Sequence, residues 1–134
     1  MRIVKLTDTL AVSEQIEAGD IGEIVAAGYR VLVNNRPDGE DPKQPGSSEI
    51  ERAALAAGLE YHYLPVTAAD FPGPGFDLMK ELLNDQSRPV LAFCRSGTRC
   101  ANLWVASRDG ETRRQAMSTA AGLGFDLSMA ARCC

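Results

Sequence analysis

Residues 89–99 read Pro-Val-Leu-Ala-Phe-Cys-Arg-Ser-Gly-Thr-Arg, a compact apolar run followed at once by a polar turn that contains a glycine. The run Pro89–Phe93 is typical of a strand buried in a parallel sheet. A helical pattern follows over Cys100–Ser107, so the turn joins a buried strand to a helix. Ligands of α/β proteins bind at the carboxyl ends of the strands, and a site is therefore expected in this turn.

The residue types in the turn suit an anion and a nucleophile together. A strand-to-helix turn leaves backbone N–H groups unpaired beside the positive end of the helix, and Gly97 allows the tight curve. Arg99 adds a guanidinium that suits oxyanions, while Arg95, Ser96 and Thr98 complete the loop. The same surroundings should lower the pKa of Cys94 below its free value of about 8.5. We predict a thiolate nucleophile at Cys94; the alternative is a buried structural cysteine.

Apolar segments and helical patterns alternate on both sides of this stretch. Further strands are expected over Ile3–Leu6, Leu10–Val12, Tyr29–Asn34 and Glu60–Leu64, the first two as a hairpin at one sheet edge. Further helices are expected from an Asp20 cap to Ala27, from a Ser48/Glu51 capping box to Ala57, over Phe76–Leu83 and over Glu111–Ala121. This order predicts an α/β fold with a mostly parallel central sheet flanked by helices.

The overall composition is that of one soluble globular domain. Of 134 residues, 45% are hydrophobic and 24% charged, and the loops at 35–47 and 69–75 are too short for linkers, so a single domain spans 1–134. The net charge of −4 and the scattered basic residues argue against nucleic acid as a partner. No stretch approaches the roughly 18 apolar residues that span a bilayer. Without a secretion signal, we expect a cytoplasmic protein that does not bind membranes.

The four cysteines do not form a disulfide framework or a zinc site. The first 93 residues contain none, and the only histidine, His62, has no cysteine close to it in the sequence. We expect no metal and no cofactor. His62 is interpreted as packing on a strand, and Trp104 as an anchor of the helix after the loop. Cys133 and Cys134 are expected to form a frayed terminus without a role; the alternatives are contact with the site or with a metal.

The segment Pro89–Trp104 resembles the phosphatase-like domain family of the bacterial beta-lactamase-hydrolase-like proteins. Three further stretches carry the resemblance, namely Asn35–Glu40 (NRPDGE), Tyr61–Val66 (YHYLPV) and Gly124–Ser128 (GFDLS). It implies a fold similar to the tyrosine and dual-specificity cysteine phosphatases. Family members also occur fused to persulfide dioxygenase-type domains, and sulfur transferase activity is attributed to the family. The resemblance therefore implies that a separately encoded persulfide dioxygenase is a partner of this chain.

Spacing within the loop separates the two chemistries that the resemblance implies. The phosphatases use Cys-x5-Arg, whereas Arg99 lies five positions after Cys94 and makes a Cys-x4-Arg loop similar to that of rhodaneses. The phosphatase pattern has His before the nucleophile and Ser or Thr after the Arg, where this chain has Phe93 and Cys100. We therefore expect a sulfur transferase that moves sulfane sulfur from a small anionic donor, through a Cys94 persulfide, to a thiol acceptor.

Two alternatives remain open. A phosphatase would hydrolyse phosphate monoesters through a phosphocysteine, with Asp70 as the general acid; Asp70 reads equally well as a solvated turn residue. A module that binds oxyanions without turnover is the third reading. Cys100 is a candidate resolving thiol or a small core residue. Arg36 and Glu40 follow a strand and should lie on the site face, where Arg36 attracts an anionic substrate or forms a surface pair.

Overall fold

One five-stranded sheet, in the order β1-β2-β5-β3-β4, organises the computed structural model, which describes residues 1–134. The strands are β1 (Ile3–Lys5), β2 (Leu10–Ser13), β3 (Val31–Asn34), β4 (Glu60–Tyr63) and β5 (Val90–Phe93). Only β1 runs antiparallel to its neighbour, and it forms the predicted edge hairpin with β2. β5 lies in the middle and pairs in parallel with β2 and β3. The predicted α/β fold with a mostly parallel sheet is confirmed.

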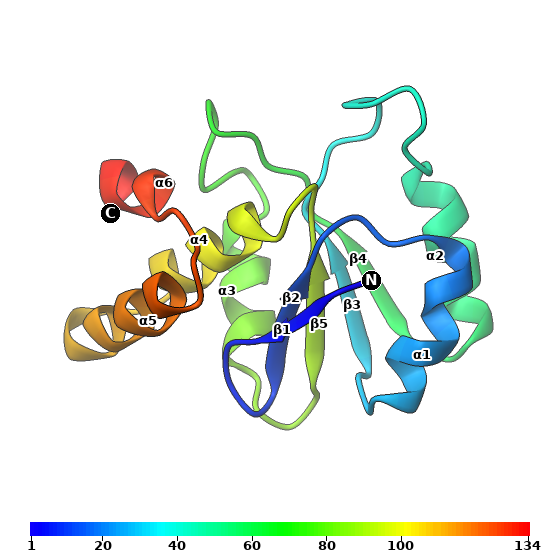
Figure 1. The fold of residues 1–134 in the computed structure, drawn as a ribbon, viewed down its shortest axis with the longest axis horizontal. Helices are drawn as coiled ribbons and strands as arrows, with labels where there is room; N and C mark the ends of the chain where they lie inside the picture. The colour runs from blue at the N-terminus through cyan, green and yellow to red at the C-terminus, as the bar shows by residue number, and fades with distance from the viewer.

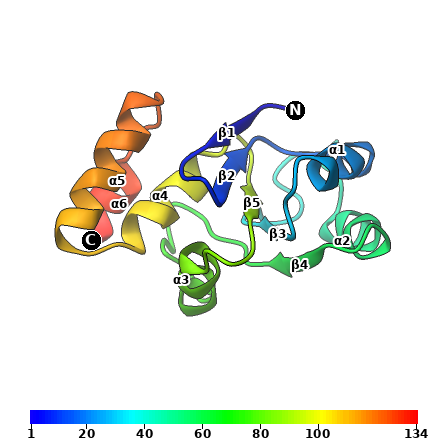
Figure 2. The same ribbon diagram turned by 90° about the horizontal axis from the view of Figure 1, so that it is seen from below.

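Helices cover both faces of the sheet and make three layers (Figures 1 and 2). One face carries a short 3-10 turn (Ala18–Asp20), α1 (Ile21–Ala26) and α2 (Ser47–Ala56). The other carries α3 (Phe76–Asn84) and α4 (Thr98–Ala106), and α5 (Gly110–Gly122) and α6 (Ser128–Cys133) pack on the outside of α4. A separate hydrophobic cluster lies between the sheet and each helix layer, which is the pattern expected for a sheet buried on both faces.

The side chains of β5 alternate between the two clusters and fix the strand from both sides. Leu91 and Phe93 pack with the α1 and α2 layer, whereas Val90 and Ala92 pack with the α3 to α6 layer. All four are at most 2% exposed. Burying a Leu or Phe side chain contributes about 1.5–3 kcal/mol. The strand that leads into the polar turn is therefore rigid, and the turn starts from a fixed position.

Three helices differ from the sequence prediction in their first residue or in their cap, and for α2 a distant residue accounts for the difference. The expected Ser48/Glu51 capping box is absent; α2 begins at Ser47, whose N–H donates to Asp38 Oδ1 at 2.8 Å. Asp20 precedes α1 as predicted, but its carboxylate accepts from the N–H of Glu17 at 2.8 Å instead of capping α1. Likewise, the helix expected from residue 100 begins at residue 98.

The C-terminal residues are ordered as α6, which corrects the expectation of a frayed end. Asn102 is fully buried in α4, and its amide donates to the backbone oxygens of Thr98 and Asp126, each at 2.8 Å. Its Oδ1 accepts from the N–H of Ala130 at 2.9 Å and so holds α6 against α4. Cys133 and Cys134 are joined by a disulfide. None of the helices combines the length and the apolar character needed to cross a bilayer.

Candidate active site

The polar turn between β5 and α4 comprises residues 94–97 and lies at the carboxyl ends of the strands, together with the loops after β3 and β4 (Figure 1). Gly97 has φ 89° and occupies the N-cap position of α4. An L side chain rarely adopts this left-handed conformation, so glycine is required where the chain turns into the helix. The structure thus confirms the position and the backbone geometry predicted for the loop.

Cys94 lies at the base of the loop, where its environment stabilises a thiolate. The N–H of Gly97 donates to its Sγ at 3.1 Å, and the side chain has no exposed surface. The pKa of Cys94 is lowered from 9.0 to about 6, chiefly by a hydrogen bond from the Cys100 thiol. Burial opposes this shift, while the backbone N–H groups of Cys100 and Ser96 and the charge of Arg99 assist it. At pH 7 about nine-tenths of Cys94 is therefore thiolate.

Cys100 is fully buried in the first turn of α4 and remains a protonated thiol. Burial raises its pKa well above 9.0, and the neighbouring Cys94 thiolate raises it further. Its Sγ also donates to Asn35 Oδ1 at 3.2 Å, and the Asn35 amide is fixed by donating to the Leu64 backbone oxygen at 2.9 Å. Because a thiol carries one proton, Asn35 and the Cys94 thiolate compete for the same donor. Asn35 is a site residue that the sequence analysis did not single out.

Arg99 is oriented by a bidentate pair with Glu40, a residue from the loop after β3. Nη1 and Nη2 each donate to a carboxylate oxygen of Glu40 at 2.8 Å, and Nη1 also donates to the Val66 backbone oxygen at 3.0 Å. A guanidinium has five N–H donors, so Nε–H and one Nη2–H remain. These two lie on one edge of the planar group and form the pair of donors that an oxyanion accepts.

Arg36 also binds the Glu40 carboxylate, so one acid holds two arginines. Its Nε donates to Glu40 Oε1 at 3.0 Å and its Nη1 to Gln15 Oε1 at 3.1 Å. The side chain is only 6% exposed, whereas a surface pair would be open to solvent. Hydrogen bonds from Arg99 lower the pKa of Glu40; burial opposes the shift and Arg36 adds to it. Arg36 and Glu40 lie on the site face as expected, and the binding of substrate by Arg36 stays a prediction.

The remaining residues of the loop face outward. Arg95 is exposed, and its side chain forms no hydrogen bond or ion pair. The Ser96 hydroxyl is exposed and donates to Thr98 Oγ1 at 3.0 Å. Cys94 itself has no exposed surface in this conformation of the loop.

Asp70 has the surroundings of an ionised turn residue. Its Oδ1 accepts from the backbone N–H of Thr67 at 2.7 Å and from the Thr67 hydroxyl at 2.9 Å. These hydrogen bonds lower the pKa of Asp70, and the residue is exposed. A general acid needs a proton at working pH, which a lowered pKa disfavours. The role of Asp70 as an acid stays a prediction.

The two other residues interpreted from the sequence lie outside the site. Trp104 is 4% exposed and packs in the larger hydrophobic cluster, as predicted for an anchor of α4. His62 is partly exposed on β4, and its Nε2 lies 2.5 Å from a carboxylate oxygen of Glu60.

Together, the sheet, the loop and the buried cysteine define a class of α/β protein that resembles the cysteine-dependent phosphatases. Solved structures of Tk-PTP and PTPMT1 share the fold, each with a TM-score of 0.67, at 21% and 16% identity. Tk-PTP covers 97% of this chain and is itself covered to 91%; for PTPMT1 the shares are 97% and 90%. A provisionally assigned phosphatase from Neisseria meningitidis is 32% identical with a TM-score of 0.79, covering 98% of this chain and 96% of its own.

The family is defined by sequence as well. The profile of the phosphatase-like domain of the beta-lactamase hydrolase-like proteins matches residues 2–111, and the chain belongs to this family. Beta-lactamase hydrolase-like proteins of Agrobacterium fabrum and Xylella fastidiosa are 32% and 35% identical over 98% and 97% of the chain. The chain spans 31% of the length of each. The domain is phosphatase-like, and the comparisons favour the phosphatase alternative over the sulfur transfer that the loop spacing favoured.

Proposed function

We propose that the domain is a cysteine-dependent phosphatase that hydrolyses phosphate monoesters. The observation that carries the proposal is the Cys94 thiolate at the base of the loop, with its pKa lowered to about 6. Arg99, which follows the loop, keeps one pair of N–H donors free beside it. Loop N–H groups and that edge of Arg99 suit the oxygens of a phosphoryl group. Membership of a phosphatase-like family supports the same reaction.

The reaction has two steps: a phosphocysteine forms at Cys94 and is then hydrolysed. Cys94 Sγ attacks phosphorus, the ester P–O bond breaks, and the departing oxygen takes a proton from an acid or from water. Water then attacks the phosphocysteine, the S–P bond breaks, and phosphate leaves with regeneration of the thiolate. Asp70 would supply the first proton in its protonated form. Aryl esters with acidic leaving groups need no such proton, so they are the substrates of choice for a first assay.

Sulfur transfer is a second candidate, favoured by Asp70. The pKa of Asp70 is lowered by Thr67, and sulfur transfer needs no acid. The Cys94 thiolate attacks the outer sulfur of thiosulfate, the S–S bond breaks, and sulfite leaves. A thiol acceptor, as thiolate, then attacks the outer sulfur of the Cys94 persulfide and restores the Cys94 thiolate. In that case the persulfide dioxygenase suggested by the resemblance would consume the acceptor's product.

Two parallel incubations separate the candidates. Intact-mass measurement after thiosulfate treatment detects one added sulfur atom, while phosphate release from an aryl phosphate measures hydrolysis. We expect turnover of the aryl phosphate that Cys94→Ser abolishes and Cys100→Ser retains. A Cys94-dependent sulfur adduct without phosphate release would overturn the phosphatase proposal in favour of sulfur transfer. Oxyanion binding without either reaction would leave a binding module and refute both.

A further inference from the structure

A polar cavity of about 290 Å³ lies at the opposite end of the sheet from Cys94. It is lined by the β1–β2 turn (Thr7, Asp8, Thr9), by Leu83 and Gln86 beside the start of β5, and by Arg108 after α4. Leu83 is the only hydrophobic residue of the six. β5 has four residues and rises about 3.3 Å per residue, so it separates the cavity by roughly 13 Å from the polar turn at residues 94–97, the proposed active loop.

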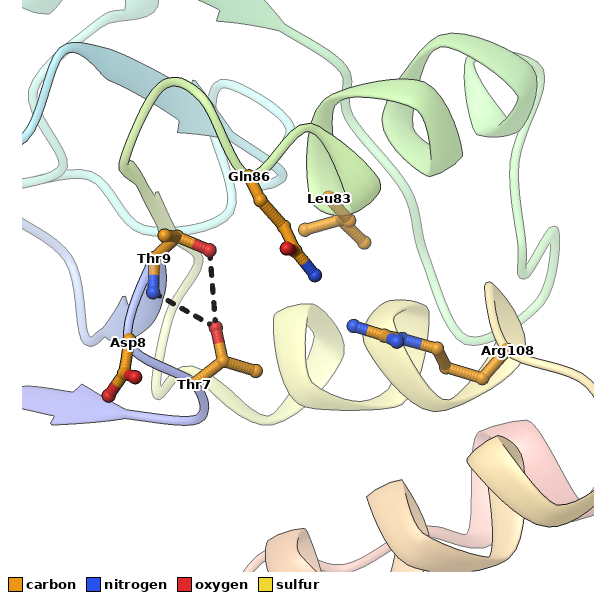
Figure 3. Close-up of a pocket in the computed structure, with 6 residues that line it drawn as sticks. All are labelled: Thr7, Asp8, Thr9, Leu83, Gln86 and Arg108. Carbon is orange, nitrogen blue, oxygen red and sulfur yellow. Dashed lines mark hydrogen bonds between the residues drawn. The ribbon is translucent and has the colours of Figure 1, made fainter.

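Arg108 supplies this cavity with an uncompensated positive charge. Its guanidinium forms no ion pair and no hydrogen bond, and it lies 5.6 Å from the centre of the Trp104 ring. Figure 3 shows the guanidinium and the Gln86 amide pointing toward each other across the cavity. The carboxylate of Asp8, the only acid in the lining, points away. The charged group that faces the cavity is therefore positive.

Neither helix capping nor ion pairing accounts for the position of Arg108. The carbonyl groups at the end of α4 are already bound, because Arg113 donates to the backbone oxygens of Ala106 at 3.3 Å and Arg108 at 2.7 Å. The guanidinium is left to the Trp104 face and the cavity. A cation–π contact with the ring attracts the guanidinium and uses none of its terminal N–H donors, which stay free for a ligand.

A second cavity of about 230 Å³ shares Thr7 and Arg108 with the first, and two buried donors of its lining residues have no acceptor. Trp104 lines it and is 4% exposed, yet its Nε1–H has no partner. Arg108 Nε is likewise buried and unpartnered, whereas its terminal nitrogens are not among the buried atoms. A buried donor without an acceptor costs about 1–3 kcal/mol. Because protein atoms enclose both of these N–H groups, an anion in the cavity would contact the terminal nitrogens of Arg108.

We propose that this region is a second binding site, which takes a small oxyanion on the guanidinium of Arg108. Gln86 and Thr7 provide uncharged donors beside it, and the Trp104 ring centre lies 5.6 Å from the guanidinium. A phosphate or a carboxylate group presents the oxygens that this donor set requires. The residues of this site are distinct from those around Cys94.

Trp104 allows a direct test, since it is the only tryptophan in the chain. Its indole N–H gives a single NMR cross-peak, which is followed while the protein is titrated with inorganic phosphate and, separately, with acetate. We expect a saturable shift of this peak. The anion that binds with the higher apparent affinity, phosphate or acetate, identifies the class of oxyanion that the site takes. Arg108→Gln should weaken the apparent affinity at least tenfold. Arg114→Gln, which removes the same charge from an exposed arginine of α5, should leave it unchanged.

Two further variants decide the remaining outcomes. Arg99→Gln weakens anion binding at the active loop, and the Trp104 response should persist in it. Gln86→Ala should weaken binding about threefold, and it tests the proposal if Arg108→Gln proves unfolded in a thermal melt. The proposal is overturned if neither anion shifts the Trp104 peak, or if the response survives Arg108→Gln in folded protein. Loss of the response in Arg99→Gln would overturn it too, by assigning the anion to the active loop.

Discussion

Replacing Cys100 with alanine should raise the pKa of the Cys94 thiol. The hydrogen bond from the Cys100 thiol is the largest cause of the lowered value, which stands at about 6 against an ordinary 9.0. A thiol is a weak donor, and we assign its hydrogen bond to a thiolate about 1.4 kcal/mol, which corresponds to one pKa unit. In Cys100→Ala the pKa of Cys94 should therefore rise to about 7.

The assay is the rate of Cys94 alkylation by iodoacetamide as a function of pH, read by mass spectrometry on the peptide that contains Cys94. Only the thiolate reacts, so the rate follows its population. At pH 6 that population falls from about one half to about one tenth, and the rate should drop about fivefold. Well above pH 8 both proteins are fully ionised and their rates should converge.

Cys100→Ser is the matched control, because its hydroxyl retains a donor at the same place. It should keep the midpoint of the profile near pH 6. The reasoning would be refuted if Cys100→Ala kept that midpoint, since the thiol would then contribute nothing to the lowered pKa. Equal upward shifts in both variants would refute it as well, because packing rather than hydrogen bonding would then be the cause.

Three other perturbations test the site and the core. Glu40→Gln loses the bidentate pair that orients Arg99, so kcat/KM for an aryl phosphate should fall about tenfold, as measured by steady-state kinetics. The lowered pKa of Cys94 makes the unfolded state bind more protons between about pH 6 and 9, so the free energy of unfolding should rise by about 1.4 kcal/mol per pH unit there. Urea unfolding should show this slope in the native protein and not in Cys94→Ala. Leu32→Ala removes a fully buried side chain from β3 and should cost about 2–5 kcal/mol in the same measurement, whereas a loss under 1 kcal/mol would contradict the packing described.

Much of the fold could be predicted because its signals are local. The apolar run at 89–93 needs no partner to be recognised as a buried strand, and the alternation of strands and helices indicates a parallel sheet. Helix ends were predicted less well. The start of α2 depends on Asp38, a residue nine positions earlier that no local capping rule includes.

The sequence by itself determined the strand, the turn and the position of Cys94 within it, because the residue types and spacing of 89–99 carry that information. Only the tertiary structure decided how the loop is supported. Arg99 forms hydrogen bonds with Glu40, which lies 59 positions earlier in the sequence, and Cys100 forms one with Asn35, which lies 65 positions earlier. The cavity at Arg108 likewise forms where a hairpin turn, a loop before β5 and the end of α4 converge. Periodicity and spacing describe neighbours along the chain, whereas these contacts exist only once the sheet has brought distant loops to the same edge.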